Sequence, residues 1–135
     1  MEQIEIQKLM QTAAADAVIY TEEAHHQTLD FTIGTLLLVD TILSDLHQQE
    51  LAQSHSSEEI FTLCNLYGAY IGEIFIANAG GNWAYNDSDK AAPFIYVQFN
   101  DKEFPFASIC YHKIMHDNSV SLYGYVKLAM ANAQQ

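Results

Sequence analysis

Two carboxylates stand in the most apolar stretches of this sequence, Asp40 within LLLVDTIL and Glu73 within YIGEIFIA. Burial raises the pKa of a carboxyl group, and two acids in one pocket can divide acid–base work between them. An ionised Asp40 needs a lysine or several backbone donors to offset its lost hydration. Both acids are therefore candidates for a small-ligand or hydrolytic site. For Asp40 the ordinary interpretation is a partly exposed acid or a buried hydrogen-bond node.

Two of the six histidines have the spacing of metal ligands. His112 and His116 are four residues apart, which places both on one face of a helix, as in zinc-binding pairs. The residues between them include no catalytic glutamate, and only the adjacent Asp117 offers a third ligand. The pair is a weak candidate metal site, and its ordinary interpretation is two polar residues near a helix end.

Local signatures of other enzymes are missing. The sequence has no paired nucleophile and no phosphate-binding loop, because Gly80 and Gly81 follow a helix rather than open one. Cys64 and Cys110 stand in apolar stretches without a C-x-x-C motif, as small buried residues of a reducing compartment do. We therefore expect a protein without cofactors that is not an enzyme.

Aromatic residues favour a binding surface instead. The chain has eight tyrosines, and tyrosine is enriched in interfaces because its ring is apolar at one end and polar at the other. Tyr70 is close to Glu73 in the sequence, and Trp83 follows a double glycine as a large apolar anchor. Tyr70 and Trp83 thus join Asp40 and Glu73 as candidate binding residues.

A long helix over residues 57–79 is predicted to position these residues. Ser56 and Glu59 form a capping box at its start, apolar residues recur along it with helical spacing, and the double glycine ends it. Gly68 and Gly72 share one face, where we expect another helix or the sheet to approach closely. Further apolar residues cover other faces, so the helix should be embedded on several sides: Phe61, Leu66, Tyr70 and Ile76.

The remaining helices and loops are predicted from the same patterns. Helices are expected at residues 2–20 (extending to about 24), 33–47 and 107–116, and after Ser119 or Ser121. Thr32 is expected to cap the second of these helices. The polar segments 21–28 and 48–57 are expected to be loops.

Strand-forming residues follow the central helix. Residues 94–99, FIYVQF, are typical of a strand, and Pro105 ends a short return strand because proline cannot donate to a ladder. With Trp83 included, a three-stranded antiparallel sheet is predicted over about residues 83–106. The expected fold is α+β, a single domain over residues 1–135 with four to five helices around the central one.

Charge limits the possible partners. The chain carries 17 acidic residues against five lysines and no arginine, a net charge of −12. Nucleic acids and anionic membranes require clustered positive charge, whereas a basic protein is a suitable partner for an acidic one. The N-terminus lacks the basic start of a signal peptide, and Asn65, Glu73 and Asn78 interrupt the apolar run at 60–79. We therefore expect a cytoplasmic protein that does not enter a membrane.

Three motifs carry a resemblance to a known family: LDFT at residues 29–32, YGAYIGE at 67–73 and GGNW at 80–83. They resemble the LDYS-like helix entry and the GAYLGE…GGxW core of a group of small bacterial proteins, a domain-of-unknown-function type. The resemblance covers roughly residues 29–128. It implies an α+β domain with a short sheet packed on helices. Because proteins of this group occur near toxin and secretion loci, it also implies an immunity or adaptor role.

The sequence therefore predicts a bacterial cytoplasmic protein-binding module, immunity- or adaptor-like, with a basic protein partner. Acidity would speed its association with that partner, and tyrosines would supply amphipathic contact area. The alternative is a small-ligand-binding protein or hydrolytic enzyme that uses Asp40 and Glu73.

The charge distribution generates the first testable prediction. Fluorescence anisotropy with labelled DNA and RNA at physiological salt should show no binding, because no cluster of positive charge is present to release counterions. Micromolar binding to either nucleic acid would contradict this expectation.

Overall fold

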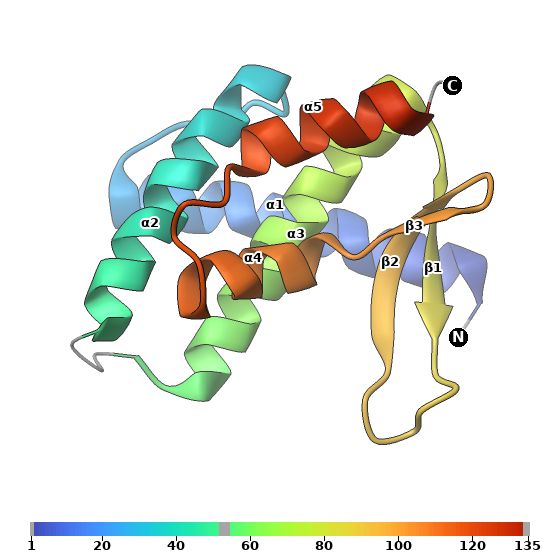
Figure 1. Ribbon diagram of the computed structural model, residues 1–135, viewed down its shortest axis with the longest axis horizontal. Coiled ribbons are helices and arrows are strands. Elements are labelled where there is room, and N and C mark those ends of the chain that lie inside the picture. Colours follow the sequence, from blue (N-terminus) through green and yellow to red (C-terminus); the bar gives the residue numbers. More distant parts are fainter. Residues whose placement is uncertain (1, 52–54, 134–135) are drawn as a thin grey trace.

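The computed structural model describes residues 2–51 and 55–133, which form five α-helices, one 3-10 helix and a three-stranded antiparallel sheet (Figure 1). The elements in chain order are α1 (Gln3–His25), η1 (Ile33–Thr35), α2 (Leu36–Leu51), α3 (Ser57–Ala79), β1 (Asn82–Asn86), β2 (Phe94–Phe99), β3 (Lys102–Phe104), α4 (Phe106–Met115) and α5 (Leu122–Ala133). The predicted α+β fold, with helices around a central one and a small sheet after it, is confirmed.

Helix α3 is the centre of the fold. It contacts α1, α4, α5 and β2 along its length. The Ser56 hydroxyl accepts the Glu59 N–H at 3.1 Å, and Gly80 and Gly81 end the helix with φ of +105° and +104°, a region that glycine tolerates best. Among the described residues it is the one helix long and apolar enough to cross a membrane, but 61% of its most apolar window is buried within the protein, as in a core helix.

Two glycines let other elements reach the α3 backbone. A Cβ on Gly68 would lie 2.7 Å from the Ala107 backbone at the start of α4. A Cβ on Gly72 would lie 2.1 Å from the Trp83 ring, which comes from β1. The expected close approach is therefore present twice, once by a helix and once by the sheet.

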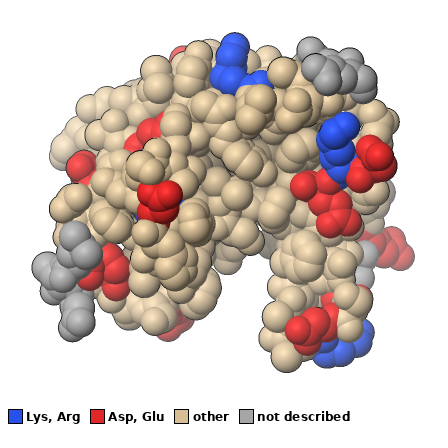
Figure 2. Space-filling model, in the orientation of Figure 1, with Lys and Arg blue, Asp and Glu red and all other residues tan. Residues whose placement is uncertain are grey.

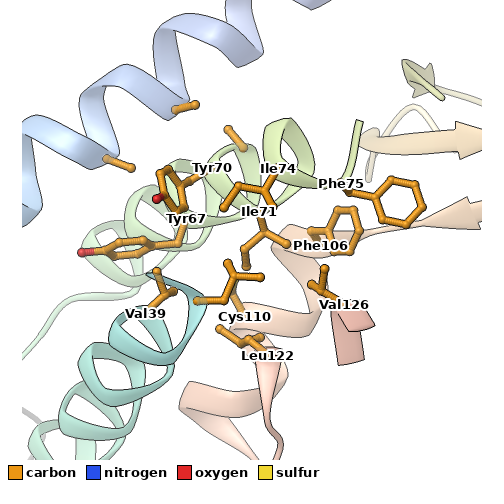
Figure 3. Close-up of a cluster of buried hydrophobic side chains, with 14 of the residues drawn as sticks. Val39, Tyr67, Tyr70, Ile71, Ile74, Phe75, Phe106, Cys110, Leu122 and Val126 are labelled. Carbon is orange, nitrogen blue, oxygen red and sulfur yellow. The ribbon is translucent and has the colours of Figure 1, made fainter. Parts of the chain in front are cut away.

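The core is built on α3 (Figure 3). Phe75 packs against Phe104 and Phe106, with ring centroids 4.8 and 5.6 Å apart, so that it joins α3 to β3 and α4. Tyr67 is fully buried and shares a 2.8 Å hydrogen bond with the buried Thr21 of α1, which satisfies both hydroxyls. Burial raises the pKa of Tyr67 to about 12, so its phenol stays neutral at physiological pH.

The sheet projects from the helical body, and the β1–β2 hairpin, residues 82–99, is called the arm below. Its strand order is β1-β2-β3, with Trp83 opposite Val97 and Tyr85 opposite Ile95. Trp83 and Val97 lie buried at the base of the hairpin, while Tyr85 and Ile95 are only partly buried. The outer half of the β1–β2 hairpin extends beyond the helices (Figure 1).

Two local predictions near the second helix are wrong. The predicted loop at 21–28 begins only after His25, because Thr21 is buried against Tyr67 and keeps this turn in α1. Thr32 does not cap a helix with its side chain. Its hydroxyl donates to Asp30 at 2.6 Å, and a 3-10 turn precedes α2. Tertiary contacts and a local side-chain turn outweigh the pattern here.

Two further predictions change in extent. Helix α2 runs to Leu51 rather than to about residue 47, so the connection to α3 is shorter than predicted, and residues 52–54 of that connection lie outside the described residues. Phe61 does not help to embed α3, since 54% of its surface is exposed. The face of α3 that carries Phe61 is therefore open.

Contact between Gly72 and Trp83 generates a stability prediction. Gly72→Ala is expected to destabilise the protein by about 2 kcal/mol, and Gly72→Leu by several kcal/mol, because each added atom must displace the indole ring. Gly34→Ala is the control, since a Cβ there meets nothing within 4 Å. Thermal and denaturant unfolding should separate the two sites. Equal melting temperatures for Gly72→Leu and the wild type would show that the contact is absent in solution.

Candidate functional site

Asp40 caps a helix that follows it by about eighty residues. Its two carboxylate oxygens accept the backbone N–H groups of Leu122 and Tyr123 at 2.6 and 3.0 Å, at the first turn of α5. The Ser121 hydroxyl lies 3.5 Å from the same carboxylate and also accepts the Gly124 N–H at 3.0 Å. The carboxylate thus satisfies donors that a helix start leaves unpaired, and its charge complements the helix dipole.

Lys113 supplies the countercharge. Its ammonium lies 3.6 Å from Asp40, and only 4% of its side chain is exposed. It also donates to the carbonyls of Asn118, at 3.0 Å, and Val120. Asp40 therefore has both the lysine and the backbone donors that a carboxylate in this position requires, and it is a hydrogen-bond node joining α2, α4 and α5.

Glu73 and Trp83 form a second pair. The indole N–H donates to the Glu73 carboxylate at 2.9 Å, while the ring itself is buried over Gly72. The carboxylate thus satisfies the one polar atom of a buried indole. Among the described residues Glu73 shares no hydrogen-bond partner with Asp40, so the two acids belong to separate hydrogen-bond groups.

Tyr70 holds the segment before η1. Its hydroxyl accepts the Phe31 N–H at 2.9 Å and is 2.6 Å from the Thr35 hydroxyl, whose own proton goes to the Thr32 carbonyl. Phe31 has φ of +63°, unusual for an aromatic residue, and its ring packs on Tyr70 with centroids 4.8 Å apart. Tyr70 is fully buried and stabilises this strained turn.

The histidine pair lies at the exposed end of α4. His112 and His116 are both exposed, with ring centroids 5.5 Å apart. Across residues 2–51 and 55–133, no group of three or more His, Cys, Asp or Glu side chains is arranged to hold a metal ion. Asp117 is occupied by Ser119, whose N–H and hydroxyl both donate to it and keep the pKa of its carboxyl below the ordinary value.

A concave site lies elsewhere, between the helices and the hairpin arm. This cleft has a volume of about 540 Å³. Five elements and the loop before β2 line it: Leu9, Met10 and Ala13 of α1; Phe61, Cys64 and Asn65 of α3; Ala107, Ser108 and Tyr111 of α4; Tyr85 of β1; Phe94 and Ile95 of β2; and Pro93 of the loop. Figure 2 shows the hollow between the body and the arm.

Exposed apolar and aromatic groups dominate the cleft. Leu9, Phe61 and Phe94 have 48%, 54% and 41% of their surface exposed. The rings of Phe61 and Tyr111 stack in parallel, with centroids 5.3 Å apart and 3° between their planes. Large exposed apolar groups gathered in one concavity are typical of an interaction site rather than of ordinary protein surface.

Four polar side chains lie within this apolar surface. The Asn65 amide and the hydroxyls of Tyr85, Ser108 and Tyr111 line the cleft, and none of them has a hydrogen-bond partner among the described residues. These groups remain available to orient a bound molecule. Cys64 also lines the cleft, but burial raises the pKa of its thiol to about 12, so it stays protonated at neutral pH.

A second, shallower pocket of about 470 Å³ lies at the start of α3. Its lining includes Tyr20, Glu58, Glu59 and Leu63. Burial, followed by the negative charge of Glu59, raises the pKa of the Tyr20 phenol. Glu58 and Glu59 give this pocket an acidic lining.

None of the candidate residues chosen from the sequence lines the cleft. Asp40 caps the start of α5, Glu73 accepts the hydrogen bond of the Trp83 indole, and Tyr70 holds the turn at Phe31. A polar or large residue in an apolar stretch is most often placed there by packing. Sequence patterns gave one signal for the cleft, Phe61, which lies off the main apolar face of α3. The other lining residues come from separate elements, and only the tertiary fold brings them together.

The chain matches no protein-family model, and no curated protein or solved structure has significant similarity to it. The assignment of a function therefore depends on the geometry described above.

The Asp40 node generates a prediction. Asp40→Asn is expected to lower the free energy of unfolding by about 3 kcal/mol, because it leaves the buried Lys113 ammonium without a countercharge. Asp45→Asn is the matched control, since Asp45 is an exposed residue of the same helix. Urea unfolding should separate the two variants.

A double variant isolates the charge pair. Asp40→Asn combined with Lys113→Met should lose less stability than the sum of the two single changes, because no uncompensated charge remains buried. Strict additivity in this cycle would show that the carboxylate and the ammonium do not interact.

Proposed function

We propose that this protein is a non-catalytic binding module of the bacterial cytoplasm that captures a basic protein partner, in the manner of an immunity or adaptor protein. The observation that carries the proposal is the open cleft between the helices and the β1–β2 arm. It combines stacked aromatic rings with unpaired polar groups, which are the features of a protein-recognition surface.

Charge supports a basic partner. Lys113 is buried on Asp40, so four of the five lysines remain accessible against a large excess of acids. Exposed carboxylates stand on the same helix faces as the cleft residues: Glu5 is one turn before Leu9, and Glu58 is one turn before Phe61. Acidic side chains lie on both sides of the hollow (Figure 2). Such a surface attracts a positively charged partner and speeds association.

The hydrolytic alternative gains no specific support. Asp40 and Glu73 already accept hydrogen bonds from α5 and from Trp83, and neither lines the cleft or the second pocket. A catalytic role would require each carboxylate to leave a partner that the fold depends on.

Matched surface variants test the proposal. Phe61→Lys places a cation in the cleft, and Ile19→Lys adds the same charge at a residue of α1 with the same exposed fraction, 54%, that does not line the cleft. Affinity capture from the native cell should recover a basic protein with the wild type and with Ile19→Lys, and should recover it at least about tenfold less with Phe61→Lys, because like charges then meet in the cleft.

The captured complex should also weaken as salt increases, since exposed charges are screened. Recovery of a stoichiometric metal or metabolite without any protein partner would contradict the proposal. Equal capture by the two lysine variants would show that the cleft is not the contact surface.

A further inference from the structure

Strand β2 has an unpaired edge inside the cleft. Two residues, Asn100 and Asp101, connect β2 to β3, so Phe99 and Lys102 are a hydrogen-bonded pair. The backbone N–H and C=O groups of alternate residues point to the same side of a strand. Those of Val97 and Ile95 therefore point to the side of β2 on which β3 lies. The Trp83 carbonyl accepts a hydrogen bond from the Gln3 side chain at 2.8 Å and therefore points away from β2. Trp83 stands opposite Val97, so this contact agrees with a Val97 backbone that is bonded to β3 and not to β1.

The partner strand ends before it reaches Ile95. β3 pairs with β2 only over Val97–Phe99, and its last residue, Phe104, stands opposite Val97. The residue that would stand opposite Ile95 in a longer strand is Phe106, but it begins α4 instead, after Pro105 turns the chain away from the sheet. The Ile95 N–H and C=O on this edge have no partner among the described residues.

This edge and the cleft are one site. Ile95 lines the cleft together with Ala107, Ser108 and Tyr111 from the start of α4, the helix that diverges at this point. A chain segment that continued the line of β3 would enter the cleft between β2 and α4. Its alternate side chains would then reach the exposed ring of Phe61 and the partly buried ring of Tyr111 that stacks on it.

We infer that the cleft binds an extended segment of a basic protein, which adds to the sheet as a strand along the Ile95 edge. This deepens the proposed function and rests on it. Main-chain hydrogen bonds to Ile95 supply affinity, and the aromatic cleft selects apolar side chains at every second position. The carboxylates of Glu5, Asp16 and Glu58, exposed on the faces of α1 and α3 that line the cleft, complement basic residues at the intervening positions.

Pro93 limits the length of the added strand. It lies two residues before Ile95 on the same edge and has no N–H to donate. The bound segment is therefore short, and its specificity comes mostly from the cleft.

Two peptides of equal composition test this mode of binding. LKLKLKL places its leucines with the period of a strand, and LKKLLKL with that of a helix. Calorimetric titration should show that the alternating peptide binds the wild type about tenfold more tightly than its isomer, since only the extended form pairs with the β2 edge.

Substitution of Ile95 identifies the edge. Ile95→Pro removes the outward N–H without disturbing the pairs with β1, and should weaken the alternating peptide about tenfold, whereas Ile95→Val should change its affinity by no more than about twofold. Circular dichroism confirms the folded state of each variant. Two N-methylated forms of the alternating peptide, one methylated at the leucines and one at the lysines, test the same point on the wild type. Only alternate N–H groups of an added strand pair with β2, so only one of the two methylated peptides should lose affinity.

The outcomes separate this inference from the proposed function. Equal affinities for the two isomers, or unchanged binding of the alternating peptide to Ile95→Pro together with equal effects of both methylations, would overturn strand addition. In that case the proposed function still stands if Phe61→Lys loses the captured partner. If capture of the partner is also independent of Phe61, both strand addition and the proposed function of the cleft are contradicted.

Discussion

Close approach to the α3 backbone is the constraint on which the rest of the structure depends. Gly68 and Gly72 remove two side chains from one face, and the Ala107 backbone and the Trp83 ring occupy the space. The first contact places α4, and the second places the base of the sheet. Since a buried indole needs a hydrogen-bond partner, Glu73 is fixed by the same contact. A residue of ordinary size at either glycine would push the sheet or α4 away from the core.

This arrangement also explains why the cleft exists. The arm is held tightly at Trp83, but α4 turns away from β2 after Pro105, so the two walls diverge toward the outer end of the hairpin. Phe61 and Tyr111 stack on each other in the lining of this open space. Apolar surface that no element of the described chain covers thus remains beside the contacts that fix α4 and the sheet on α3.

Sequence patterns predicted the elements better than the site. Helical spacing, the capping serine and the double glycine defined α3, because these features depend on neighbours in the chain. The requirement of Asp40 for a lysine or backbone donors was also foreseeable from its apolar context. The identity of those donors was not, since Lys113 and the start of α5 approach only in the tertiary fold. The cleft was missed for the same reason, because it combines residues from separate elements with a strand edge that no local pattern records.

The central claim is that a protein partner occupies the cleft and the Ile95 edge. Hydrogen–deuterium exchange of the whole chain, free and saturated with its captured partner, tests this directly. The account predicts slower exchange in the segments 61–65, 93–96 and 107–111, each of which contributes residues to the cleft lining, and unchanged exchange in α5. Protection confined to α5, or unchanged exchange at residues 93–96 in the saturated complex, would contradict it.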